Sequence, residues 1–167
     1  GSDGKEPLVT FQGRKRLPFQ SVIRIMQKAG SAMYGIRLGG IVVVDCDTDN
    51  VQTLDFASAG FGHSDFMVKT SRGRHLYFHG ENTQPEKIAI DRVKIDLKTG
   101  PNAYVVGPGS VRPDNGAVYT LASDWLPSPN LLPAFADRRD NPLRHHPEWG
   151  TVGGRNYVLF SLARQLV

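Results

Sequence analysis

The sequence predicts an α+β fold in which a sheet carries acidic and basic residues on one face. Short stretches of alternating or continuous apolar residues recur between residues 34 and 121, separated by turn residues, which is typical of strands. Apolar residues with helical spacing occur in two stretches of the first sixty residues. The 18 glycines and 11 prolines agree with abundant loops and few long helices.

Two helices are expected in the first third of the chain, at residues 15–29 and 49–59. In the first, Pro18 suits the opening turn, an apolar stripe follows, and Gly30 ends the helix. In the second, the side chain of Asp49 is expected to cap the first turn, and three apolar residues supply buried contacts.

The strands are expected to be short and to be joined by glycine-containing turns. Residues 34–47 should form a strand, a turn at Gly39–Gly40 and a second strand. A tight turn at Arg72–Gly73 should join two further strands. The later strands are predicted at residues 65–71, 74–79, 93–98, 103–106 and 117–121.

The organisation of the chain follows from its composition. The 167 residues suffice for one ordinary domain or two small modules that share a core. Gly1–Ser2 resembles the remnant of an expression tag and carries no argument. Residues 3–122 are expected to form the core, residues 123–153, rich in Pro, Arg and His, a linker or arm, and residues 154–167 the truncated start of a following helical region.

The net charge and the cysteine content limit the classes of function that fit this chain. The formal net charge of +4 suits an anionic partner. Cys46 is the only cysteine, which excludes an internal disulfide and a cysteine-ligated zinc site and fits a reducing cytoplasm. We expect no signal peptide and no membrane span.

The most informative segment is residues 41–47, where four apolar residues run directly into two aspartates. A continuous run of β-branched residues is typical of a central strand that is buried on both faces. Side chains alternate along a strand, so Asp45 and Asp47 are expected on one side and Cys46 on the other. Two neighbouring carboxylates repel each other at a buried strand end, and a divalent cation relieves that repulsion. The segment therefore predicts a metal-dependent site.

Two further groups of polar residues lie on predicted strands. Ser71, Arg72 and Arg74 surround a glycine-containing turn beside His75, and such cations, hydroxyls and exposed amides are suited to hold a triphosphate. Asp96 lies on the polar face of an otherwise apolar strand. Three carboxylates with a basic loop indicate two-metal chemistry on a nucleotide, with two Mg²⁺ or Mn²⁺ ions about 3.5–4 Å apart.

Two other motifs begin with the same D-x-D letters. A calcium-binding EF-hand loop needs Gly at its sixth position and Glu at its twelfth, where this chain has Asn50 and Phe56, so that motif is rejected. A haloacid dehalogenase-type phosphatase needs Thr or Val four residues after the first Asp, where this chain has Asp49. The phosphatase stays open as the weaker alternative.

Together these residues resemble the primase-polymerase domain of the archaeo-eukaryotic primase superfamily, as found in phage and plasmid replication proteins. The first motif there is a hydrophobic strand ending in D-x-D, similar to residues 43–47. The second is a Ser, a short glycine-containing turn and His-hydrophobic-Tyr-Phe, similar to residues 71–78. The third is hydrophobic-Asp, a glycine turn, an apolar strand and Pro-x-Ser, similar to residues 95–110. Residues 154–163 resemble the Gly-x-Arg-Asn helix that often follows such domains.

The resemblance implies an RRM-like catalytic sheet packed with a smaller N-terminal α/β unit. It implies that Asp45, Asp47 and Asp96 are catalytic ligands of two Mg²⁺ or Mn²⁺ ions, and that Ser71 and His75 hold the phosphates of the incoming nucleotide. Further nucleotide-binding candidates are Lys69, Arg72, Arg74 and Lys98. Many relatives have Gly-Gly where this chain has charged residues around Gly73, which implies either a tighter hold on the triphosphate or contact with the template or primer backbone.

The expected function is that of a DNA primase and DNA polymerase. It would catalyse template-directed nucleotidyl transfer from NTPs or dNTPs to a 3′-hydroxyl on single-stranded or primed DNA. The chain would be the catalytic fragment of a larger phage- or plasmid-encoded replication protein in the bacterial cytoplasm, with a downstream helicase region. The alternative is a catalytically silent nucleic-acid-binding module of a replication initiator or helicase, followed by the D-x-D phosphatase.

Overall fold

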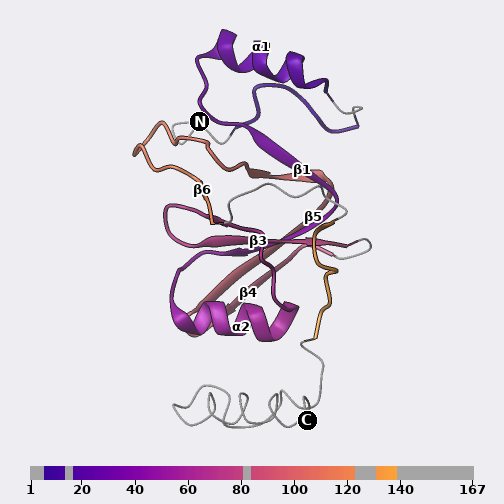
Figure 1. Cartoon of the computed structure of the whole chain (residues 1–167), viewed down its shortest axis with the longest axis vertical. Coiled ribbons are helices and arrows are strands. Elements are labelled where there is room, and N and C mark those ends of the chain that lie inside the picture. Colours follow the sequence, from indigo (N-terminus) through magenta and orange to yellow (C-terminus); the bar gives the residue numbers. More distant parts are fainter. Residues whose placement is uncertain (1–5, 14–16, 81–83, 123–130, 139–167) are drawn as a thin grey trace. The chain divides into compact units, whose positions relative to one another are not determined.

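The computed structural model describes residues 6–13, 17–80, 84–122 and 131–138, and the described residues up to residue 136 form one compact unit (Figure 1). Within the described residues, two helices accompany one antiparallel sheet with the strand order β4-β5-β1-β3-β2-β6. The α+β class is confirmed, whereas the RRM-like arrangement with a smaller N-terminal unit stays a prediction. The elements are α1 (Phe19–Ala29), β1 (Gly35–Cys46), α2 (Val51–Phe61), β2 (Met67–Lys69), β3 (Arg74–His79), β4 (Glu86–Ile90), β5 (Val93–Val106) and β6 (Thr120–Leu121).

Strand β1 lies in the middle of the sheet, between β3 and β5. Its segment Ile41–Val44 is at most 8% exposed. Val42 and Val44 belong to one apolar cluster, whereas Val43 belongs to the cluster on the other face of the sheet. The prediction of a central strand that is buried on both faces is therefore confirmed, and the run of β-branched residues explains it.

The two faces of the sheet carry different cores. Helix α2 packs against β1 and β5, and Figure 1 shows it lying along one side of the sheet. Ala57 and Phe61 of α2 belong to an apolar cluster that also contains Leu76 and Phe78, two alternate residues of β3. On the other face, Tyr77 and its neighbours pack against the loops that follow β5. This second face carries the pocket described below.

Two predicted strand–turn–strand segments are single long strands. The expected turn at Gly39–Gly40 is wrong, because β1 runs through it and pairs with β5 on both sides of a register irregularity. Gly40, with φ 76°, lets the backbone absorb that irregularity without reversing direction. Likewise, the predicted strands 93–98 and 103–106 are the two ends of β5. Pairing of β1 with β5 before and after the irregularity keeps both strands continuous.

Both helices begin later in the chain than predicted. Helix α1 begins at Phe19, directly after Pro18, which is extended and serves as the N-cap, so residues 17 and 18 of the predicted helix are not helical, and residues 15 and 16 lie outside the described residues. A left-handed glycine ends α1 as expected. In α2 the N-cap is Asn50, whose side chain accepts the Thr53 N–H at 2.7 Å, and the predicted cap at Asp49 is wrong. The Asp49 carboxylate instead accepts a hydrogen bond from Arg74.

The remaining strands agree with the predictions to different degrees. Strand β3 has the predicted bounds, while β2 and β6 are shorter than residues 65–71 and 117–121. Strand β4 was not predicted, because only Ile88 of its five residues is buried and the apolar pattern is correspondingly weak. It forms the edge of the sheet beside β5.

Residues 131–136, which the sequence placed in a linker, pack onto the core. The backbone of His79 accepts a hydrogen bond from Phe135 at 2.7 Å and donates one to Pro133 at 2.8 Å. The Phe135 ring stacks on Phe61 with 5.6 Å between centroids. The other parts of the predicted linker, 123–130 and 139–153, and the predicted helical region 154–167 lie outside the described residues.

Candidate active site

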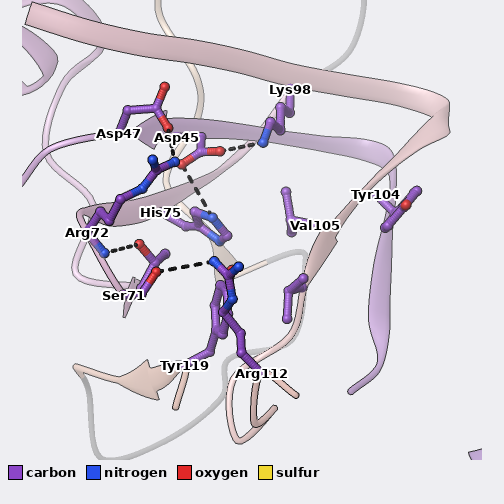
Figure 2. A pocket seen from close by; sticks show the side chains of 12 residues that line it. Asp45, Asp47, Ser71, Arg72, His75, Lys98, Tyr104, Val105, Arg112 and Tyr119 are labelled. Carbon is purple, nitrogen blue, oxygen red and sulfur yellow. Dashed lines mark hydrogen bonds and ion pairs between the residues drawn. The ribbon is translucent and has the colours of Figure 1, made fainter. Parts of the chain in front are cut away.

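A pocket of about 180 Å³ opens on the face of the sheet opposite α2 (Figure 2). Six of the nine site residues predicted from the sequence line it, namely Asp45, Asp47, Ser71, Arg72, His75 and Lys98. The rest of its lining was not predicted and comprises Thr70, Tyr104, Val105, Val106, Arg112 and Tyr119. Asp45 and Asp47 lie on the same side, as the alternation along the strand predicted.

Strand register brings the sequence motifs together. In β1, Asp45 is the direct partner of His75 on β3 and of Asp96 on β5. Residues directly opposite each other in an antiparallel pair project to the same face of the sheet. Lys98 pairs with Val43, two positions from Asp45, and so projects to this face as well. Three separate stretches of sequence thus supply neighbouring side chains around one carboxylate.

Asp45 is nearly buried and is held by two basic groups. Its side chain is 12% exposed, and the Lys98 ammonium donates a hydrogen bond to Oδ2. The His75 Nε2 atom lies 3.4 Å from Oδ1. Desolvation lowers the pKa of Lys98, but the charge of Asp45 and its hydrogen bond outweigh this effect and raise the pKa overall. Lys98 is therefore charged and balances Asp45, as a buried carboxylate requires.

The loop between β2 and β3 forms the second wall of the pocket. The Thr70 N–H donates to the Gly73 carbonyl at 2.9 Å, and the Gly73 N–H donates to the Thr70 hydroxyl at 3.0 Å, which confirms the predicted tight turn. This turn presents Ser71 and Arg72 to the pocket, where the Arg72 guanidinium lies 3.7 Å from Asp47. A Cβ on Gly73 would lie 1.8 Å from the Cys46 carbonyl oxygen. The glycine is therefore required for the loop to approach the end of β1.

Arg112 is a pocket residue that the sequence analysis missed. Its side chain is 12% exposed, and its Nε and Nη2 atoms both donate to the carboxylate of Asp114. The Nη1 atom lies 3.5 Å from the Ser71 hydroxyl oxygen. The available signal was its place two residues after the Pro-x-Ser motif, but a single arginine in a loop carries little information. Only the packing of that loop beside Ser71 identifies it.

Three of the predicted site residues do not line the pocket. Asp96 shares the face of Asp45, but its nearest recorded cation is Lys87, with 4.0 Å between Nζ and Oδ2. Lys69 and Arg74 pair with each other across β2 and β3, one position from His75, and therefore project to the opposite face. Arg74 is bound there to Asp49, so the pocket gives no support to phosphate binding by these two residues.

The carboxylates are of the right kind for a hard divalent cation, because Mg²⁺ and Mn²⁺ prefer oxygen ligands. Within the described residues, however, no group of three or more His, Cys, Asp or Glu side chains is arranged to hold a metal ion. At Asp45, the Lys98 ammonium already donates a hydrogen bond to Oδ2. The ligand chemistry fits a metal, and occupation of Asp45 by a metal would displace the Lys98 ammonium.

Comparison with known proteins supplies an independent finding. A family model described as "Bifunctional DNA primase/polymerase, N-terminal" matches residues 1–149, which include all three motifs. Neither the curated proteins nor the solved structures give a significant match to this chain. Among the helices of the described residues, none has the length and apolar character needed to cross a bilayer.

Proposed function

Because the chain belongs to the bifunctional DNA primase/polymerase N-terminal family, we propose that it synthesises DNA or primers by two-metal nucleotidyl transfer. The family implies a nucleotidyltransferase of the primase and polymerase type, and its members generally depend on a divalent metal. The observation that supports two-metal nucleotidyl transfer is that one pocket is lined by Asp45, Asp47, Ser71 and His75. Carboxylates and phosphate-binding groups side by side are what the reaction requires.

In the proposed reaction, a 3′-hydroxyl attacks the α-phosphate of a bound nucleoside triphosphate, and the bond from that phosphorus to the β,γ-pyrophosphate breaks. Asp45, Asp47 and Asp96 would hold the divalent cations, which when bound activate the hydroxyl and neutralise the departing pyrophosphate. Ser71 and Arg72 are placed to donate hydrogen bonds to phosphate oxygens along one wall of the pocket.

His75 and Lys98 also take part in the proposed reaction. His75 is 5% exposed and lies between the carboxylates and the basic wall, so it can donate to a phosphate from a fixed position (Figure 2). Lys98 lines the same pocket and, once released from Asp45, would pair with the negative charge of the phosphates instead. The opposite wall, where Val105 lies, offers apolar surface for the sugar and base (Figure 2).

A catalytically silent nucleic-acid-binding module is the second candidate, and one observation favours it. Each of the three carboxylates lies within 4.0 Å of a basic side chain, namely Lys98, Arg72 or Lys87. Carboxylates that are already neutralised need no metal. A thermal shift measurement with Mn²⁺ and a nucleotide separates the two candidates, because joint stabilisation is expected only for the enzyme.

The direct test is a primer-extension and de novo priming assay, with NTPs and dNTPs supplied separately and Mg²⁺ or Mn²⁺ present. The double variant Asp45→Asn and Asp47→Asn should yield no product while its circular dichroism spectrum is retained. Asp55→Asn, an exposed carboxylate on α2, serves as the matched control and should extend primers like the wild type. Extension by the double variant at a near wild-type rate would overturn the metal assignment. Phosphate release from small esters without templated product would instead support a phosphatase.

A further inference from the structure

The pocket has an acidic end, at Asp45, and a basic end, at Arg112. Figure 2 shows Asp45 and Lys98 at one end, Arg112 at the other, and His75 between them. Arg112 is joined at its end by the Ser71 hydroxyl, 3.5 Å from Nη1. In the proposed reaction the α-phosphate lies at the carboxylate end, where the bond to pyrophosphate breaks. The phosphate chain then extends toward the basic end, and its last phosphate lies nearest Arg112.

Arg112 is fixed in place before any ligand arrives. Its Nε and Nη2 atoms are engaged by Asp114, which sets the plane of the guanidinium. The surrounding loop is tied by hydrogen bonds from the Arg112 N–H to the Ala117 carbonyl and from the Gly116 N–H to the Arg112 carbonyl, both 2.9 Å. An ordered arginine loses little side-chain entropy when it binds a phosphate. With Nε and Nη2 engaged by Asp114, the Nη1 group that faces Ser71 is the donor directed toward a phosphate, and the fixed plane of the guanidinium sets the direction of that bond.

We propose that Arg112, positioned by Asp114, binds the terminal phosphate of the incoming nucleotide and makes the pocket select triphosphates over diphosphates. This inference rests on the proposed function and adds a specificity-determining residue to it. A diphosphate ends before the basic end and leaves Arg112 unused, whereas a triphosphate gains its charge-assisted hydrogen bonds. Asp114 is a positioning residue, which acts only through Arg112.

The test measures binding of dATP, dADP and dAMP by titration calorimetry with Mn²⁺, without primer or template, so that no turnover occurs. Arg112→Gln keeps hydrogen-bonding groups for Asp114 but removes the charge. It should weaken dATP binding by about 10- to 100-fold, the range of a charge-assisted contact, and change dADP binding by less than about threefold. Arg92→Gln, which removes an exposed arginine outside the pocket, is the charge-matched control and should leave both affinities unchanged.

A double-mutant cycle tests the part played by Asp114. Asp114→Asn should weaken dATP binding less than Arg112→Gln does, and the double variant should match Arg112→Gln alone. Additive losses would show that Asp114 acts independently of Arg112 and would overturn its positioning role. Equal weakening of dATP and dADP by Arg112→Gln, or no weakening at all, would overturn the inference and leave the proposed function intact. A wild-type protein that binds none of the three nucleotides would overturn both.

Discussion

The contact between Gly73 and the end of β1 fixes how the phosphate-binding loop meets the carboxylates. A Cβ at residue 73 would lie 1.8 Å from the carbonyl oxygen of Cys46 and 2.9 Å from the backbone nitrogen of Thr48. Real Cβ atoms essentially never approach another heavy atom within 3.0 Å, so the two backbones must part by about 1 Å. Gly73→Ala is therefore expected to push Ser71 away from Asp45.

The size of the effect follows from what blocks the methyl group. Overpacking costs about 1–3 kcal/mol where side chains can shift. Here the obstacle is the backbone of the central strand, so we expect a loss of about 3 kcal/mol or more in the free energy of unfolding. The free energy of unfolding of a typical domain is about 5–15 kcal/mol, so the variant should still fold at low temperature. A loop displaced by about 1 Å should also weaken nucleotide binding, because Ser71 and Arg72 would no longer meet the phosphates.

Urea unfolding followed by circular dichroism measures the first effect, and dATP titration at low temperature measures the second. Gly39→Ala is the matched control, because a Cβ there meets no atom within 4 Å, and because Gly39 lies on β1, the strand that Gly73 approaches. Its free energy of unfolding should differ from the wild type by less than about 1 kcal/mol. If Gly73→Ala were as stable as Gly39→Ala and bound dATP normally, the close approach of loop and strand would be refuted.

Four further predictions concern the core and the charged site. Phe135→Ala should lower the free energy of unfolding by about 2 kcal/mol in a urea titration, because its ring stacks on Phe61; an unchanged value would mean that the segment is a free arm. Burial first, and then the charge of Asp45, raise the pKa of Cys46 from 9.0 to about 12, so a thiol reagent at pH 8 should label the protein only after unfolding. Between pH 9 and 12 the thiol is ionised in the unfolded chain but still protonated in the folded one. The free energy of unfolding of the wild type should therefore fall by up to about 1.4 kcal/mol per pH unit relative to that of Cys46→Ala. Lys98→Met should increase the affinity of the nucleotide-free protein for Mn²⁺ in calorimetry, because the competing ammonium is gone; lower affinity would show that Lys98 assists metal binding.

The parts of the site that sequence predicted are those set by one stretch of chain. Alternation with a period of two is a property of a single strand, so Asp45 and Asp47 could be placed on one side without knowledge of any partner. The same alternation puts His75 and Tyr77 on one face of β3. The apolar run before Asp45 likewise indicated burial on both faces, which the core clusters confirm.

The errors arose where a distant segment overrides a local signal. The two glycines at 39–40 are typical of a turn, but pairing of β1 with β5 on both sides of them keeps the strand from reversing direction. Asp49 is a good helix cap by type, yet Arg74 from another strand binds it and Asn50 takes the cap. In both cases a partner more than twenty residues away in the chain decided the outcome.

By itself, then, the sequence determined the α+β class, the central strand, the shared side of its two aspartates and the family to which the chain belongs. Only the tertiary structure decided that Lys98 balances Asp45, that Arg74 projects away from the pocket, and that Arg112 enters it. The physical reason is the range of the interactions involved. Side-chain alternation is encoded residue by residue, whereas strand register and the close approach at Gly73 exist only once separate segments have packed together.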